Sequence, residues 1–249
     1  MSAEVRVHLL PSLFEPAELS GGTAVIIDVL RASTTMIQAL HSDAARILPC
    51  GSVEEATLLG AGIPKAQVLF GGERHGKLIE GFDLDNSPRL YTSERVGGKT
   101  VIFTTTNGTR ALLRAEQAAS ICIGAFVNLS AVEGYLRGQG GPIHLVCAGT
   151  DGRLTAEDIL FAGVLADRLV GDDSSDGCDV STEMAIDFAR RNAGSAEEIL
   201  KTLRRSQGGK NLTALGMDAD IVFAADSDRL PVVPVWDAGR RSTREVRLV

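Results

Sequence analysis

The sequence has few cysteines, no long apolar run and no excess of positive charge, and each absence excludes a class of protein. Its four cysteines form no CxxC pair and no disulfide-framework spacing, so we expect free thiols. No apolar run approaches the roughly 20 residues that a membrane span needs, so no membrane is expected as a partner. The net charge of -7 over 249 residues argues against nucleic acid as a partner, because phosphate backbones select basic surfaces.

Two further absences concern location and organisation. The first residues include Glu4 and no long apolar core, which is not typical of a secretory signal, so we expect a cytoplasmic protein. No linker rich in proline or serine divides the chain. Residues 1–249 are therefore predicted to form a single integrated α/β domain.

One unit is present three times: a buried strand, a small polar turn and an amphipathic helix. The copies are Ala24–Leu40, Thr100–Ala115 and Ile143–Leu169. Repeated units of this kind predict an α/β fold, with a mixed sheet between helices in a three-layer α/β/α arrangement. A turn between a strand and a helix N-terminus offers free N–H groups, which suit an anion.

The remaining elements follow from periodicity, caps and turn residues. Further strands are expected at Val5–Leu10, Arg46–Cys50, Gln67–Phe70 and Ser120–Gly124, and further helices at Ser52–Gly62, Asn128–Arg137, Ser181–Arg191 and Ala196–Arg205. The segment 71–91 is polar and glycine-rich, which favours a functional loop, and Asp172–Asp179 reads as an acidic surface stretch. The segment from Asp220 is predicted as a strand, a turn and an extended edge containing prolines.

The first turn carries Asp28, Arg31 and Ser33. A carboxylate at the end of a parallel strand points into the crevice where α/β proteins bind ligands. Arg31 can hold a phosphate with two parallel hydrogen bonds, and Ser33 or Thr34 can cap the next helix. A plainer alternative is that Asp28 pairs with Arg31 and only orders the turn.

The second turn, Thr104–Arg110, places several hydroxyl and amide groups together. Gly108 permits a positive φ, so that neighbouring N–H groups can converge on one anion. The alternative is an ordinary turn capped by Thr109. We favour anion binding, because a cap needs only one such residue.

The third turn runs from Cys147 to Asp158 and includes Asp151, Arg153 and Glu157. Thr155 and Asp158 have capping-box spacing, which alone would explain Asp158 but not Glu157. Two adjacent carboxylates in the first turn of a helix suit Mg²⁺. We predict that Asp28, Glu157 and Asp158 converge on that metal.

Cys147 and Arg153 also match the spacing of cysteine-dependent phosphatases, in which a thiolate attacks phosphate. The match is weak because this spacing often arises by chance, and Asp151 within the loop would repel a phosphate dianion. Two other motifs fail on their context. Gly71–Lys77 lacks the hydroxyl residue and the capped helix of a P-loop, and the Asp83/Asp85 pair does not follow a buried strand directly.

Taken together, five segments resemble the 2-phosphosulfolactate phosphatase family. They are IDVLRASTT, GGERHGKLIEGFDLDNSP, TTTNGTRAL, CAGTDGRLTAEDILFAG and LTALGMDADIVFAADSDRLPVVP, in order along most of the chain. The resemblance implies a family-specific α/β fold and a Mg²⁺-dependent hydrolase. The implied reaction converts 2-phosphosulfolactate, or a related phosphorylated 2-hydroxy acid, to sulfolactate and phosphate, a step towards coenzyme M.

Residue roles follow from the turns and the resemblance. We predict Asp28, Arg31 and Asp151 as catalytic, and Asp28, Glu157 and Asp158 as metal ligands. The predicted substrate-binding residues are Ser33, Arg74, Asn86, Ser87, Thr106, Asn107, Gly108, Thr109 and Arg110. The expected partner is a small anionic phosphate ester, with a homodimer as an assembly to test. A non-catalytic binding protein for an organic anion remains the alternative from another functional class.

Overall fold

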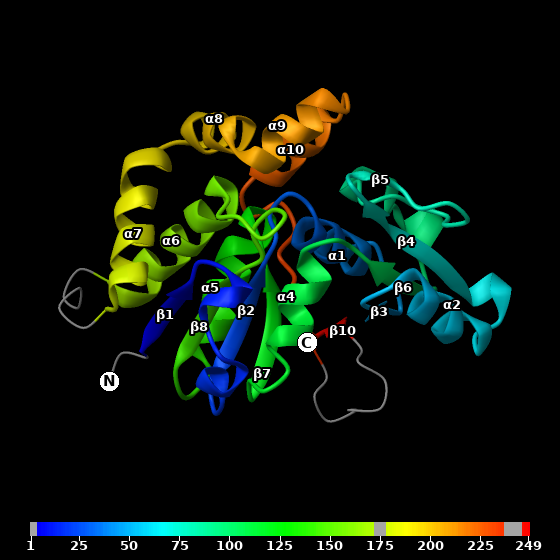
Figure 1. The fold of residues 1–249 in the computed structure, drawn as a ribbon, viewed down its shortest axis with the longest axis horizontal. Coiled ribbons are helices and arrows are strands. Elements are labelled where there is room, and N and C mark those ends of the chain that lie inside the picture. The colour runs from blue at the N-terminus through cyan, green and yellow to red at the C-terminus, as the bar shows by residue number, and fades with distance from the viewer. Residues whose placement is uncertain (1–3, 172–177, 237–245) are drawn as a thin grey trace.

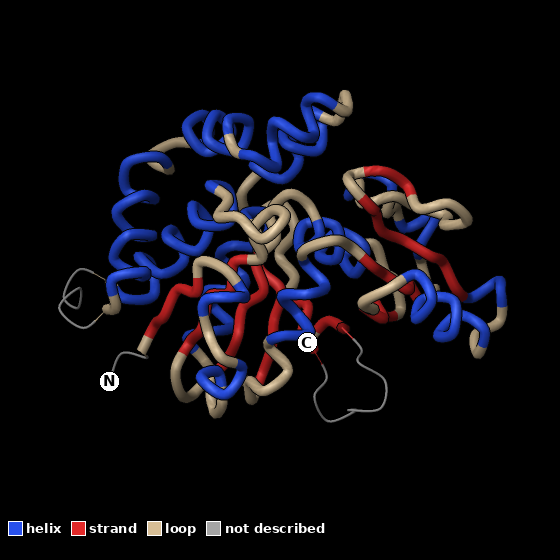
Figure 2. The backbone as a smooth tube through the Cα atoms, viewed as in Figure 1, coloured by secondary structure: helices blue, strands red, loops and turns tan. Residues whose placement is uncertain are grey.

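The computed structural model describes residues 4–171, 178–236 and 246–249. Its strands are β1 (Val5–His8), β2 (Thr23–Ile27), β3 (Arg46–Pro49), β4 (Val68–Arg74), β5 (Lys77–Leu78), β6 (Thr100–Thr104), β7 (Ser120–Gly124), β8 (Ile143–Cys147), β9 (Pro234–Trp236) and β10 (Val246–Leu248). Its α-helices are α1 (Ala32–His41), α2 (Val53–Ala61), α3 (Ser93–Val96), α4 (Gly108–Arg114), α5 (Leu129–Arg137), α6 (Ala156–Val170), α7 (Val180–Asn192), α8 (Ala196–Arg205), α9 (Gln207–Ala214) and α10 (Asp218–Ala225). Each strand and helix of the three repeated units forms as predicted (Figure 2).

The strands form one mixed sheet in the order β1-β8-β2-β7-β9-β10-β3-β6-β4-β5. One group, β1-β8-β2-β7, is parallel throughout, and so is a second group, β3-β6-β4. The antiparallel pair β9 and β10 joins the two groups. The first and third repeated units are therefore neighbours in the sheet, whereas the second lies in the other group.

The residues of β2 show why the sheet lies between two helical layers. Ala24 and Ile26 pack into a core that includes α1 and α4, whereas Val25 and Ile27 pack into a core that includes α5 and α6. A strand covered on both faces needs apolar residues at every position, and all five residues of β2 are buried. The predicted three-layer α/β/α architecture is confirmed. That residues 1–249 form a single integrated domain stays a prediction.

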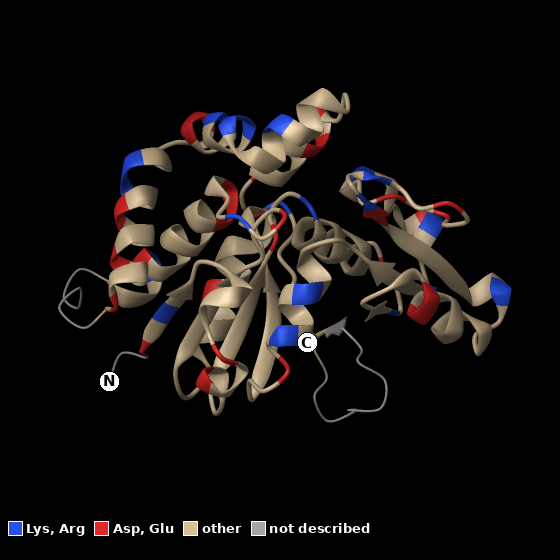
Figure 3. Ribbon diagram, viewed as in Figure 1, with Lys and Arg blue, Asp and Glu red and all other residues tan. Residues whose placement is uncertain are grey.

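Helices α8, α9 and α10 lie above the central strands, and the β4–β5 hairpin approaches the same region from the other strand group (Figure 1). We call residues 196–225 the helical arm. Charged side chains of both signs lie along α7 and α8, whereas β2, β7 and β8 carry none (Figure 3). Among the described residues, no helix combines the length and apolarity of a bilayer span.

Two predictions for the late sequence are wrong. Asp218–Ala225 is the helix α10, although its apolar run reads as a strand. The extended segment that follows is not an edge, because β9 lies between β7 and β10. Pro234 is compatible with this inner position because it is the first residue of β9. Most of the predicted acidic stretch, residues 172–177, lies outside the described residues.

Candidate active site

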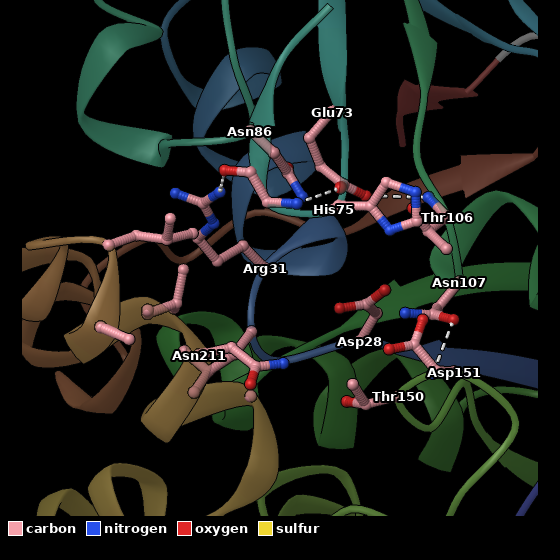
Figure 4. Close-up of a pocket in the computed structure, with 16 residues that line it drawn as sticks. Asp28, Arg31, Glu73, His75, Asn86, Thr106, Asn107, Thr150, Asp151 and Asn211 are labelled. Atoms are coloured by element: carbon pink, nitrogen blue, oxygen red, sulfur yellow. Dashed lines mark hydrogen bonds between the residues drawn. The ribbon is translucent and has the colours of Figure 1, made fainter.

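A cavity of about 310 Å³ lies where strands from both parallel groups end (Figure 4). Residues at or just beyond the ends of β2, β4, β6 and β8 line it: Asp28, Glu73, Thr106, Asn107, Thr150 and Asp151. The helical arm closes the cavity with Gly208, Asn211, Leu212 and Leu215. In sheets of parallel strands, ligands bind in the crevice at the carboxyl ends of the strands. Here two groups of strands, rather than one, contribute to that crevice.

Asp28 occupies the centre of this arrangement. One of its oxygens, Oδ1, accepts the backbone N–H of Ala32 at 3.2 Å and so caps α1. Burial, together with the negative charges of Glu73 and Glu157, raises the pKa of Asp28 from 3.8 to about 7. The predicted caps Ser33 and Thr34 do not cap α1: the Ser33 hydroxyl accepts the N–H of Asp28 and donates to a β2 carbonyl. Because Ser33 is fully buried, the structure places it behind the cavity rather than in its wall.

The loop after β6 divides its polar groups between the cavity and the protein interior. Thr106 and Asn107 line the cavity, and the Thr106 hydroxyl is buried without a hydrogen-bond partner. Thr109 is fully buried, and its hydroxyl donates to the Thr105 carbonyl at 2.7 Å. Arg110 is exposed and does not line the cavity.

Gly108 is needed for a reason other than the predicted positive φ, which it does not adopt. A Cβ at this position would lie 2.6 Å from the Ala32 Cβ and 2.8 Å from Oδ2 of Asp28. Such distances are too short for a side chain to fit without movement. Gly108 therefore allows α4 to approach Asp28 closely.

The polar segment 71–91 supplies a residue that the sequence did not single out, Glu73. Its carboxylate is buried and accepts the N–H of Gly76 at 2.7 Å and that of Thr106 at 2.8 Å. Glu73 thus fastens the β4–β5 hairpin to the loop after β6. Asn86 lines the cavity with its Oδ1 buried and unpartnered, and its predicted contact with the substrate stays a prediction. Arg74 bonds Thr104 and the Glu73 carbonyl and does not line the cavity.

Arg31 reaches the cavity wall but is already engaged. Its side chain is 2% exposed and pairs with Asp220 of α10, with Nη1 2.7 Å from Oδ2. The predicted substrate ligand Ser87 donates its hydroxyl to the other oxygen of Asp220 at 2.7 Å. The alternative in which Asp28 pairs with Arg31 is therefore wrong, because Asp220 is the ion-pair partner.

The acidic residues of the third turn lie in different surroundings. Asp151 lines the cavity with a positive φ of 51°, and its N–H donates to Asn107. Asp158 instead accepts the N–H groups of Val29 and Gly149, at 2.9 and 3.0 Å, and thereby ties the β2 turn to the β8 turn. No side-chain capping bond forms at the start of α6, so the predicted capping box is wrong.

The predicted metal trio does not form a cluster around the cavity. Glu157 accepts a hydrogen bond from the Thr155 hydroxyl and also bonds Ser206 and the Gly208 backbone. Burial raises the pKa values of Glu157 and Asp158, and neither side chain lines the cavity. Among the residues that the structure describes, no three His, Cys, Asp or Glu side chains form a group that could hold a metal. Of the trio, only Asp28 lines the cavity.

The cysteine-dependent alternative is contradicted by the position of Cys147. This residue is fully buried in β8, and burial beside Asp158 and Glu157 raises its pKa well above the usual value. A thiol with a raised pKa is a poor nucleophile. Neither Cys147 nor the exposed Arg153 lines the cavity.

The chain matches the family model described as 2-phosphosulpholactate phosphatase over residues 8–239. It belongs to this family. A probable 2-phosphosulfolactate phosphatase of Symbiobacterium thermophilum is 39% identical over 223 residues, covering 90% of this chain and 94% of the relative. Proteins of the same name from Thermotoga petrophila and Gloeobacter violaceus are 40% and 36% identical, covering 85% of this chain and 88% and 86% of themselves. The predicted family and enzyme class, a phosphoric monoester hydrolase, are confirmed.

Several cavity residues of this family member were not predicted: Glu73, His75, Thr150, Gly208 and Asn211. Glu73 and His75 lie in the polar segment already expected to be functional, so its glycines were a usable signal. Gly208 and Asn211 lie in α9, which carries no chemical motif and is brought to the cavity only by the packing of the helical arm.

Proposed function

We propose that this chain is a Mg²⁺-dependent phosphatase that hydrolyses 2-phosphosulfolactate, or a related phosphorylated 2-hydroxy acid, to sulfolactate and phosphate. The observation that carries this proposal is the cavity at the strand ends, where Asp28, Arg31 and two unpartnered polar atoms meet. The names of the relatives support the substrate. A place on the route to coenzyme M is part of the same proposal.

The balance of charge in the cavity supports a divalent cation. Three carboxylates line it, those of Asp28, Glu73 and Asp151. The lining residues with basic side chains include Arg31, which is paired with Asp220, and His75. A substrate carrying phosphate, carboxylate and sulfonate would meet net repulsion here unless a cation entered with it.

The donor chemistry fits Mg²⁺. This ion prefers oxygen ligands, and is usually held by one or two carboxylates together with substrate phosphate and water. Asp28 would hold it, with the buried Asn86 Oδ1 and Thr106 Oγ1 as further oxygen donors. When bound, Mg²⁺ would neutralise charge on the phosphoryl group and orient the attacking oxygen.

The chain's own residues would bind and orient the substrate. Arg31 would donate to the phosphate from the wall opposite Thr106 and Asp151 in the view of Figure 4. Asn107 and Thr150 also line the cavity and offer further polar contacts to the substrate. The apolar side chains of the helical arm, Leu212 and Leu215, would limit access of bulk water to the reacting group.

The test is phosphate release from synthetic 2-phosphosulfolactate, with p-nitrophenyl phosphate as a generic ester. We expect turnover with Mg²⁺ and its loss after exhaustive chelation, with recovery when Mg²⁺ returns. Cys147→Ser should keep activity, since its thiol lies outside the cavity. Full activity after chelation would refute metal dependence. Hydrolysis of the generic ester alone would refute the substrate, and tight anion binding without turnover of either would favour a binding protein.

A further inference from the structure

The ion pair between Arg31 and Asp220 joins two segments that are far apart in the chain. Arg31 follows β2 at the cavity wall, and Asp220 lies in α10 of the helical arm. The Arg31 guanidinium also donates to the Met217 sulfur at 3.0 Å and to the Gly76 carbonyl at 3.3 Å. Arg31 is thus held by the helical arm and by the β4–β5 hairpin.

Asp220 is itself held in place. Its Oδ2 binds Arg31, and its Oδ1 accepts the Ser87 hydroxyl at 2.7 Å. Its side chain is 3% exposed. Each carboxylate oxygen therefore has a hydrogen-bond partner within the protein.

A guanidinium is a planar group with five N–H donors in fixed directions. Three of these donors are directed to Asp220, Met217 and Gly76, so the helical arm and the β4–β5 hairpin together fix the plane of the Arg31 guanidinium. Two N–H groups are left to donate to a ligand. Arg31 lines the cavity, whereas Asp220 does not.

We propose that Asp220 is a positioning residue, which holds the Arg31 guanidinium so that its free N–H groups are directed at the phosphate of the substrate. This inference rests on the proposed function. It assigns to the helical arm a role in phosphate binding, beyond that of covering the cavity.

Stability alone is a poor explanation for this pair. Removing two charges from water opposes the gain from their attraction, so buried ion pairs are often no more stabilising than apolar residues of the same volume. Arg204 of α8 and Asp218 of α10 form a second ion pair, but these side chains are 46% and 47% exposed and neither lines the cavity. Asp218→Asn is therefore a matched control, because exposed pairs contribute little.

The test is the affinity for inorganic phosphate, measured by calorimetry with Mg²⁺ present, for the full chain and its variants. Asp220→Asn should weaken phosphate binding by about tenfold or more, and Asp218→Asn by less than about twofold. Asp220→Glu keeps the charge but displaces it by one methylene, so it should also weaken binding. Ser87→Ala removes the other hydrogen bond to Asp220 but leaves the ion pair intact, so it should weaken phosphate binding less. This variant replaces Asp220→Asn in the test if Asp220→Asn does not fold.

A double-mutant cycle separates positioning from general structural damage. In an Arg31→Gln background, adding Asp220→Asn should cause no further loss of phosphate affinity, because the residue through which Asp220 acts is gone. An equal loss in both backgrounds would overturn the proposal, as would wild-type affinity in folded Asp220→Asn and Asp220→Glu. Turnover of 2-phosphosulfolactate by the wild-type chain is measured separately. Its absence, with the phosphate cycle intact, would refute the proposed function and not the positioning role.

Discussion

The strand-end wall of the cavity and its helical-arm wall are built in different ways. At the strand ends, polar side chains follow directly after buried strands, as with Asp28 after β2 and Thr106 after β6. The helical arm lines the cavity mainly with apolar residues and with Asn211, whose Oδ1 accepts a hydrogen bond from Gln207, and its Asp220 binds Arg31 without lining the cavity. We therefore propose that the strand ends carry the chemistry and that the arm fixes its geometry.

The two walls are also connected by buried acids. Glu157 at the start of α6 bonds the backbone of Gly208 in α9, and Asp220 in α10 binds Arg31. Each of these carboxylates joins one wall to the other. Three groups of variants, ordered by expected effect, test this division of roles.

The largest effect is expected for Asp28→Asn. Loss of the central carboxylate should lower kcat/KM by about 10³-fold or more, because the group proposed to hold Mg²⁺ beside the reacting phosphate is removed. The measurement is phosphate release with Mg²⁺ present. Activity close to wild type would mean that the chemistry lies elsewhere in the cavity.

The same variant should be more stable in alkaline solution. The folded-state pKa of Asp28 is raised from 3.8 to about 7, so the folded protein holds the proton more tightly than the unfolded chain. Stability then falls as the pH rises between those values, and Asn removes this loss. Thermal unfolding at pH 8 without metal should show a higher midpoint for Asp28→Asn. A lower midpoint for Asp28→Asn at pH 8 would contradict the conclusion that the ionised Asp28 carboxylate destabilises the folded protein.

The second variant set compares Gly208, which lines the helical-arm wall, with Gly108, which packs against Asp28 beside the strand-end wall. At Gly208, a Cβ would lie 2.2 Å from Oε1 of Glu157, and at Gly108 it would lie 2.8 Å from Oδ2 of Asp28. Gly108→Ala and Gly208→Ala should each lower kcat/KM by about tenfold or more, because small displacements in an active site reduce the rate strongly. Kinetics on folded protein measure both effects.

Gly134 supplies the control for this comparison. It lies within α5, and nothing lies within 4 Å of the Cβ that it would gain. Gly134→Ala should keep full activity and stabilise the protein by up to about 1 kcal/mol, as expected for a helix interior. If Gly208→Ala is as active as Gly134→Ala, the arm does not fix the geometry of the site.

The sequence predicted the strands that end at this wall because the signals for them are local. A buried strand followed by Asp28, or by a run of threonines, identifies both the element and the direction of its polar groups. Local patterns of the same kind gave a wrong prediction where tertiary packing determines the secondary structure. The apolar run around Asp220 reads as a strand, and only the structure shows that it is a helix whose acid lies against Arg31.

The metal set illustrates the same limit. Glu157 and Asp158 have the residue types and spacing of Mg²⁺ ligands, yet both are engaged by protein groups in the structure. Besides partners in their own turn, these carboxylates have hydrogen-bond partners at Val29 in the turn after β2 and at Gly208 in the helical arm. No local pattern shows that a carboxylate has such partners.

The smallest effect is expected far from both walls, at His8 and His144. His8 Nε2 lies 3.0 Å from His144 Nδ1, and burial, with the neighbouring His144, lowers the pKa of His8 from 6.5 to about 4. The unfolded chain therefore binds a proton at a higher pH than the folded protein does. The stability supplied by the neutral pair is complete above about pH 6.5 and is lost as the pH falls towards 4.

His8→Gln should reduce this acid sensitivity without affecting catalysis. The measurement is chemical unfolding at pH 7.5 and pH 5 for the wild-type chain and the variant, with turnover at pH 7.5 as the control. We expect a smaller decrease in stability between the two pH values in the variant, and equal turnover, because neither histidine lines the cavity. An equal decrease in both proteins would mean that acid sensitivity arises from other groups. Reduced turnover would mean that the edge of the sheet at β1 and β8 is coupled to the strand-end wall, and the two regions would then no longer be separable.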